Sequence, residues 1–158
     1  MAIVETRIDD RLIHGQVCSL WIPKYDVQRI LIVDDEIAQN EMRKTALRFG
    51  CPERCKLSIF DSAKAAEKLG RHIDEGIRVM ILVNSPVPLL KMAEHGYTVP
   101  FVSVGNMAGK PGARKVSQMA YATDEEWKAF EGLAQRGVQI CVQELPNDAR
   151  EDITADFK

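Results

Sequence analysis

The densest group of reactive side chains in the sequence lies in residues 7–17, RIDDRLIHGQV. An imidazole is available in its neutral form near pH 7, so His14 can act as a nucleophile towards phosphorus or as a general base. Arginine binds phosphate oxygens through its forked donors, and both Arg7 and Arg11 are close in sequence. These residue types predict a site that holds a phosphoryl group beside a histidine.

The neighbouring residues favour the same chemistry. Asp9 or Asp10 can orient an arginine or the imidazole. Gly15 lets the backbone approach an anion, and a helix expected from about Gln16 would direct free amide groups towards it. A single histidine is more often a packed structural residue, and surface ion pairs contribute little. Here, however, two arginines, two aspartates, a histidine and a glycine share nine positions, which indicates a functional site.

The elements that must position this segment follow from alternating apolar and helical stretches. Near-continuous apolar runs, typical of strands buried on both faces, occur at residues 3–4, 29–33, 56–60, 78–83, 101–104 and 138–142. Helical spacing and capping residues occur between them at 37–49, 61–70, 86–94 and 124–136. The alternation predicts an α/β fold, a single-domain open, mainly parallel sheet with helices on both faces. Ligands of such folds bind beyond the carboxyl ends of the strands, where residues 7–17 would lie.

Composition limits the other possibilities. The chain has 158 residues, of which 46% are hydrophobic, so we expect one domain that spans residues 1–158. A net charge of −2 provides no basic field for nucleic acid. The longest apolar run, Val79 to Val83, is far shorter than the roughly 18 residues that span a bilayer, and the N-terminal residues lack the pattern of a secretory signal. We therefore expect a cytoplasmic protein with its four cysteines reduced.

Residues 7–17 resemble the signature of the enzyme IIB subunits of the mannose, fructose and sorbose group of the bacterial phosphoenolpyruvate-dependent sugar phosphotransferase system. The similarity continues through residues 32–36, 42–45, 84–86, 104–108 and 136–138. The resemblance implies that His14 accepts a phosphoryl group on Nδ1 from the phosphohistidine of a IIA phosphocarrier, and passes it to a sugar bound by the membrane IIC and IID permease subunits. It also implies peripheral association with the permease. Because the sequence has no fused IIA domain, we expect the IIA partner on a separate chain, and we expect neither cofactor nor metal. The sugar and the oligomeric state stay open.

The resemblance also assigns roles to individual residues. Arg11 is the expected main partner of the phosphoryl oxygens, with Asp10 as the carboxylate that orients it. Gly15, Gln16 and Arg7 complete the predicted phosphate-binding group, although a structural ion pair accounts for Arg7 equally well.

A second wall of the site is expected from residues 105–115, GNMAGKPGARK, which follow a predicted strand. Three glycines and a proline make a regular element unexpected there, and loops of this length are often functional. Two positions depart from the family pattern, because Asn106 stands where relatives commonly have glycine and Gly109 where they often have a bulky residue. The wall is predicted to comprise Gly105, Asn106, Met107 and Lys115, with a solvated basic loop as the alternative.

The reactive segment also contains apolar residues. Leu12, Ile13 and Val17 alternate with the polar residues around the histidine. Because weak, rapidly exchanging partners need small contact areas, we expect these three side chains to offer apolar contacts to them.

Other classes of site have less support. Cys51 and Cys55 could supply two zinc ligands, but no second pair follows at the usual spacing. Histidine phosphatases and phosphomutases need an arginine directly before the first histidine and a second histidine late in the chain. Here Ile13 precedes His14 and no histidine follows His95. Glycine-rich nucleotide-binding motifs are also absent from the sequence, and a purely regulatory binding domain would require an unreactive His14.

Overall fold

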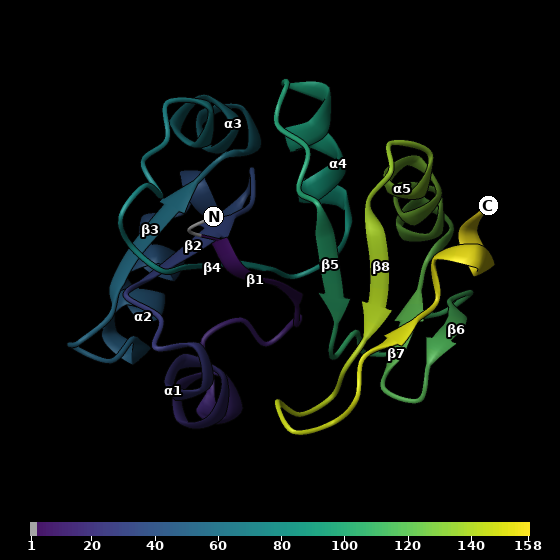
Figure 1. Ribbon diagram of the computed structural model, residues 1–158, viewed down its shortest axis with the longest axis horizontal. Coiled ribbons are helices and arrows are strands. Elements are labelled where there is room, and N and C mark those ends of the chain that lie inside the picture. The colour runs from purple at the N-terminus through teal and green to yellow at the C-terminus, as the bar shows by residue number, and fades with distance from the viewer. Residues whose placement is uncertain (1–2) are drawn as a thin grey trace.

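A computed structural model describes residues 3–158 of the chain, and its centre is a seven-stranded sheet (Figure 1). The strand order is β3-β2-β4-β1-β5-β8-β9. The first six strands in this order pair in parallel, and only β9 runs antiparallel to its neighbour β8. The strands are β1 (Ile3–Ile8), β2 (Arg29–Val33), β3 (Lys56–Phe60), β4 (Val79–Val83), β5 (Phe101–Val104), β8 (Gln139–Val142) and β9 (Glu151–Asp152).

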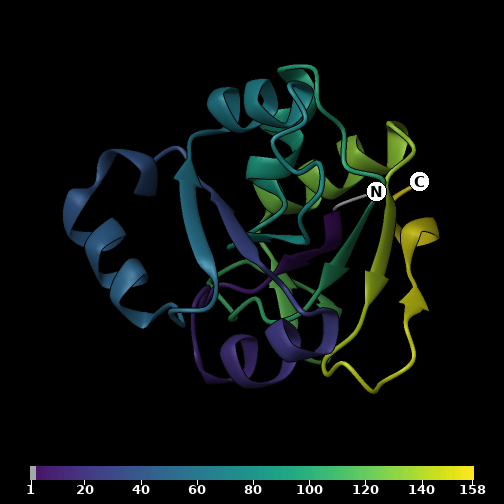
Figure 2. The ribbon, with the colours of Figure 1, turned by 60° about the vertical axis from the view of Figure 1, so that its left-hand side comes forward.

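Helices cover both faces of this sheet, as predicted (Figures 1 and 2). One face packs against α3 (Ser62–Gly70), α4 (Val87–Glu94) and α5 (Asp124–Gln135). The other packs against a π-helical turn, η1 (Val17–Trp21), the helix α1 (Ile22–Tyr25) that continues it, and the 3-10 turn η2 (Ile37–Gln39).

The strand sequences explain the two-sided burial. Leu31 and Val33 of β2 point into one core, whereas Ile30 and Ile32 point into the other. Successive side chains of a strand alternate between faces, so a strand buried on both sides must be apolar throughout. The near-continuous apolar runs of the sequence are therefore confirmed as parallel strands, of which β3 lies at the edge of the sheet and is only partly buried.

The structure differs from the sequence-based elements in three places. The predicted helix 37–49 divides into η2 and α2 (Glu41–Gly50), because Asn40 adopts an extended conformation and its side chain accepts a hydrogen bond from the amide of Arg43 at 3.1 Å. The predicted loop 105–115 ends early, since its last two residues begin a short hairpin of β6 (Arg114–Ser117) and β7 (Ala120–Ala122). A final turn, η3 (Thr154–Phe157), packs against α5. Within residues 3–158, no helix is long and apolar enough to cross a membrane.

The position of β1 sets up the functional region. β1 lies between β4 and β5. The chain builds β2, β3 and β4 on one side of β1 and then crosses to the other side to form β5 and β8. The carboxyl end of such a strand is where open α/β folds bind ligands. Residues 9–16 leave β1 at this edge.

Candidate functional site

The loop after β1 is fixed to the strands on both sides of it. The amide of Asp9 donates to the carbonyl of Val83 at the end of β4, and the amide of Asp10 donates to the carbonyl of Asn106 beyond β5. The chain then turns sharply, because the amide of Leu12 donates back to the carbonyl of Asp9 at 3.0 Å. Leu12 has a φ of 56°, a conformation that is costly for a side chain of this kind, and its burial in the core holds it there. The loop is therefore a well-defined support for the residues that follow.

Asp9 is the centre of the site. Its carboxylate is 1% exposed and accepts from Arg11 through both oxygens: Nε and the backbone amide reach Oδ1 at 3.0 Å, and Nη2 reaches Oδ2 at 2.9 Å. The same Oδ2 lies 3.0 Å from Nε2 of His14. Burial alone raises the pKa of Asp9, but the hydrogen bonds from Arg11 and the charges of His14 and Arg11 outweigh it and hold that pKa below its ordinary value. Asp9 is thus an ionised carboxylate at neutral pH.

The ionised state of Asp9 determines which ring nitrogen of His14 carries the hydrogen. A carboxylate without a proton can only accept hydrogen bonds, so Nε2 of His14 must carry the hydrogen that lies between them. In a neutral imidazole the lone pair is then on Nδ1, and Nδ1 of His14 has no hydrogen-bond partner within residues 3–158. The side chain is 16% exposed, so the ring is held mostly inside the protein.

A helix begins directly after the histidine. The amide of Cys18 donates to the carbonyl of His14 at 3.0 Å, and residues 15 and 16 are helical before the π-helical turn η1. The first amides of a helix have no partners inside it and carry partial positive charge, which favours an anion nearby. Gly15 leaves this end open, since a Cβ there would meet no atom within 4 Å. Gln16 accepts from Nη2 of Arg11 at 3.3 Å.

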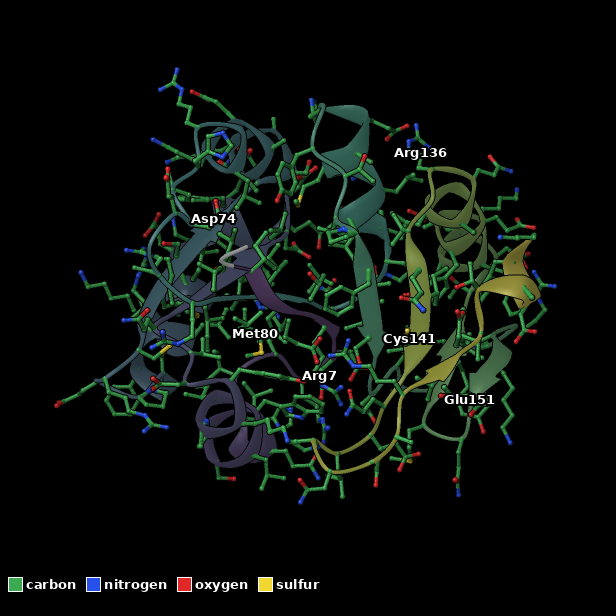
Figure 3. The ribbon with its side chains drawn as sticks, in the orientation of Figure 1. Arg7, Asp74, Met80, Arg136, Cys141 and Glu151 are labelled. Carbon is green, nitrogen blue, oxygen red and sulfur yellow. The ribbon has the colours of Figure 1, made fainter. Side chains whose placement is uncertain are left out.

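Arg7 has a structural position beneath the site. Figure 3 shows it at the centre of the molecule, between the α1 side and the C-terminal segment. Its guanidinium is buried, donates to the carbonyls of Gln143 and Glu144 at 2.7 and 3.0 Å, and stacks over the ring of Trp21 at 4.0 Å. Burial lowers the pKa of Arg7. Arg7 also lines a cavity of about 160 Å³ that it shares with Arg11 and six other residues.

The predicted second wall is only partly in place. Gly105 and Asn106 line this cavity together with Gln16. Met107, however, is buried in the core, and Lys115 lies on β6 away from the cavity lining. The wall therefore reduces to the first two residues of the predicted four.

Asp10 connects the two loops instead of orienting Arg11. Its carboxylate accepts from the side-chain amide of Asn106 at 2.8 Å and from the backbone amide of Ala108 at 2.6 Å. The prediction that Asp10 orients Arg11 is wrong in this respect, because the turn closed by Leu12 places Asp9 against the guanidinium. Asn106, which departs from the family pattern, therefore has a structural role, because its side-chain amide binds Asp10 in the loop that follows β1.

Two of the three apolar side chains that were expected to contact partners are not accessible. Leu12 and Val17 are buried in the core, and Ile13 packs partly against it. The exposed apolar side chains beside the cavity are Met119 and Leu145, at 46% and 40%. The sequence did not single out these two residues, because they come from the hairpin and from the segment after β8.

Two further observations concern alternative sites. Among the described residues, no group of three or more histidine, cysteine or acidic side chains could hold a metal ion. A second hollow of about 270 Å³ lies beyond β2 and β4, lined by residues that include Asp34, Asp35, Asn84 and Lys91. Asp34 is engaged there by Asn84 and by the amides that begin η2.

The fold and this edge of the sheet define an open α/β domain with a histidine held by a buried aspartate after its central strand. Comparison with known proteins gives the family. Residues 3–158 match the family model described as PTS system sorbose subfamily IIB component, where PTS denotes the phosphotransferase system. The chain belongs to this family, and it therefore functions as a IIB component in phosphoryl transfer during sugar uptake. The resemblance and the fold class inferred from the sequence are both confirmed.

Individual relatives agree with this assignment. The PTS system fructose-specific EIIB component of Bacillus subtilis (strain 168) is 38% identical over 152 residues, which cover 96% of this chain and 93% of that protein. The PTS system mannose-specific EIIAB component of Escherichia coli (strain K12) is 34% identical over 95% of this chain, which spans only 46% of that longer protein. Among solved structures, the IIBSor domain of the sorbose permease from Klebsiella pneumoniae is 30% identical, with a TM-score of 0.87 over 98% of this chain and 95% of that domain.

Proposed function

We propose that Nδ1 of His14 is the atom that carries the phosphoryl group. The observation that supports this most directly is the contact of Nε2 with the ionised carboxylate of Asp9 at 3.0 Å, which leaves the lone pair on Nδ1. In this proposal residues 1–158 act as one IIB phosphocarrier domain, and the family role in phosphoryl transfer is performed by the histidine after β1.

The reaction consists of two displacements at phosphorus. The lone pair of Nδ1 attacks the phosphoryl group of a phosphohistidine on the IIA donor; the new N–P bond forms as the donor N–P bond breaks, and the donor imidazole takes the electron pair. The imidazole of His14 then bears positive charge, which the carboxylate of Asp9 offsets. In the second step a sugar hydroxyl attacks the same phosphorus; the O–P bond forms as the Nδ1–P bond breaks, the electron pair returns to Nδ1, and the hydroxyl proton passes to water.

Arg11 is the proposed partner of the phosphoryl oxygens. Its Nε and Nη2 are engaged by Asp9, but Nη1 makes no hydrogen bond within the described residues, and the side chain is 43% exposed. A guanidinium anchored on one side can present its other donors to an anion without losing much conformational freedom. The helix amides after His14 and the side chain of Gln16 complete the group that would surround the phosphoryl oxygens.

The proposed partners follow from the family. A IIA phosphocarrier supplies the phosphoryl group, and membrane IIC and IID subunits bind the sugar that receives it. This chain associates peripherally with those membrane subunits. Met119 and Leu145, exposed beside the cavity, replace Leu12 and Val17 as the apolar contacts offered to these partners.

The test is phosphorylation in a reconstituted system. The purified protein is incubated with phosphoenolpyruvate, the general phosphotransfer proteins and its IIA partner, and acid-labile phosphate is mapped. We expect label on wild type and on His95→Ala, a control at an exposed histidine, and none on His14→Ala. Label that persists on folded His14→Ala would contradict the proposal. Arg11→Ala should slow transfer strongly with the fold intact, and an unchanged rate would remove Arg11 from the mechanism.

A further inference from the structure

Helix α2 gains little from packing against its own protein. It has ten residues, none of which is buried, and its inner side consists only of the half-buried Lys44 and Leu47. Isolated helices of this length are marginal in water. In Figure 2, α2 is the blue helix that forms the left edge of the molecule. Its outer side is therefore a surface that no other part of residues 3–158 covers.

That outer side is apolar. Phe49 is 94% exposed and Met42 is 83% exposed, and they are the two most exposed large apolar side chains within residues 3–158. Residues seven apart lie on the same side of a helix, two turns from each other. Between them are the small exposed residues Thr45 and Ala46, which together with Met42 and Phe49 line a shallow groove. Two large exposed apolar side chains on one helix face indicate an interaction surface.

The charges along this surface indicate what covers it. Glu41 in the first turn and Arg48 in the last turn are both exposed, and their spacing of seven residues places them on one edge of the apolar side. When two copies of α2 pack antiparallel around a two-fold axis, this edge of one helix faces the same edge of the other. Glu41 of each copy then meets Arg48 of the other. In a parallel pair the same two edges would lie on opposite sides of the interface, so Glu41 and Arg48 would not meet across it.

The shapes of the side chains complement one another in the same arrangement. A two-fold axis midway between Met42 and Phe49 passes by Thr45 and Ala46, whose small side chains allow the helices to approach. Phe49 of one copy then contacts Met42 of the other at each end, a favourable sulfur–aromatic pairing. Interfaces of this symmetry use the same patch on both subunits, so a patch must complement itself, as this one does.

We propose that the α2 surface, made by Glu41, Met42, Thr45, Ala46, Arg48 and Phe49, is a self-association surface through which two copies of this chain pair with antiparallel α2 helices. Two ten-residue helices form a small interface, so the association is weak and reversible. It is independent of the phosphoryl-transfer proposal, because none of these residues lies in the loop after β1.

Sedimentation velocity at protein concentrations from roughly 10 µM to 1 mM tests the proposal, because small interfaces associate weakly. Wild type is expected to shift from monomer to dimer as concentration rises. Phe49→Asp should raise the dissociation constant by more than about tenfold, as for a central apolar anchor. Leu20→Asp, which adds the same charge at a 39% exposed apolar position elsewhere, should associate like wild type. Circular dichroism checks that each variant is folded, and Met42→Asp provides a second variant of the same surface.

A charge exchange tests the antiparallel geometry. Arg48→Glu places acidic residues opposite each other and should weaken the dimer by about two- to tenfold, an effect that salt reduces. The double variant E41R/R48E restores opposite charges between identical copies and should recover the wild-type dissociation constant. A wild type that stays monomeric throughout the range, or a folded Phe49→Asp that dimerises like wild type, overturns the proposal. Failure of E41R/R48E to recover association overturns the antiparallel pairing.

Discussion

Replacing Asp9 with asparagine tests the mechanism at its centre. Oδ2 of Asp9 lies 3.0 Å from Nε2 of His14 and accepts from Nη2 of Arg11 at 2.9 Å, while Oδ1 accepts two further hydrogen bonds from Arg11. In Asp9→Asn one of these oxygens becomes an amide group that donates. If that group faces Nε2 of His14, the imidazole accepts there, its hydrogen moves to Nδ1, and the proposed nucleophile is blocked.

The size of the effect follows from the bond that is lost. A hydrogen bond to a charged group contributes about 1.5–3 kcal/mol, so losing the one between Asp9 and His14 should slow transfer roughly 10- to 150-fold. The assay is rapid-quench transfer of labelled phosphate from phosphorylated IIA. ¹⁵N NMR of the histidine ring gives a second readout, which should show hydrogen on Nε2 of His14 in wild type and on Nδ1 in folded Asp9→Asn.

Asp10→Asn is the matched control. Asp10 binds the loop that contains Asn106 and Ala108, and it makes no hydrogen bond to His14 or Arg11 within the described residues. This variant should keep hydrogen on Nε2 of His14 and slow transfer only a few-fold. The reasoning is refuted if Asp10→Asn slows transfer as much as Asp9→Asn, or if Asp9→Asn transfers at the wild-type rate with hydrogen still on Nε2.

Three further predictions concern stability, measured by urea unfolding. Burial raises the pKa of Glu5 from 4.5 to about 7, so the folded protein holds this proton more tightly than the unfolded chain. Wild type should therefore lose roughly 3 kcal/mol between pH 4.5 and pH 7, and Glu5→Gln should abolish that slope; parallel pH curves would contradict this. A Cβ at Gly105 would lie 2.5 Å from Nη2 of Arg7 and 2.8 Å from a backbone oxygen, so Gly105→Ala should cost about 1–3 kcal/mol. Gly109→Ala, whose nearest contact would be 3.9 Å, is its near-neutral control. Thr123→Ala removes the cap of α5 and should cost about 1 kcal/mol, whereas Thr123→Ser should retain most of it; equal losses would contradict the capping role.

The sheet could be predicted because burial on both faces constrains every residue of a central strand. β4 shows this most clearly, since all five of its residues are buried. The hairpin of β6 and β7 could not be found in this way, because both strands are short and their residues differ in exposure. Met107, beyond β5, adds to this pairing, because its amide and carbonyl bond to Met119 and Tyr121. Contacts between segments separated in this way leave no periodic pattern in the sequence.

The candidate site was predictable in its residue types but not in the assignment of its two aspartates. Alternation along β1 does place Glu5, Arg7 and Asp9 on one side, and all three are buried. This alternation could have predicted that Asp9 is buried. The role of Asp10 was not accessible, because its partners at Asn106 and Ala108 are nearly one hundred residues away. The turn itself is closed locally by Leu12, whereas the position of the Asp10 carboxylate is set by these distant contacts.

The loop after β1 shows how a short segment combines support with chemistry. Leu12 is buried beneath the turn, and the hydrogen bond from its amide to the carbonyl of Asp9 closes the turn in which Arg11 reaches back to the Asp9 carboxylate. Once Arg11 and His14 share this carboxylate, neutralising charge is already in place before a phosphoryl group arrives, so little reorganisation is needed during transfer. The strain at Leu12 is offset by its burial and by the hydrogen bonds of Asp9. A carrier must accept a phosphoryl group and release it again, and a site whose charges are held by the protein itself suits both steps.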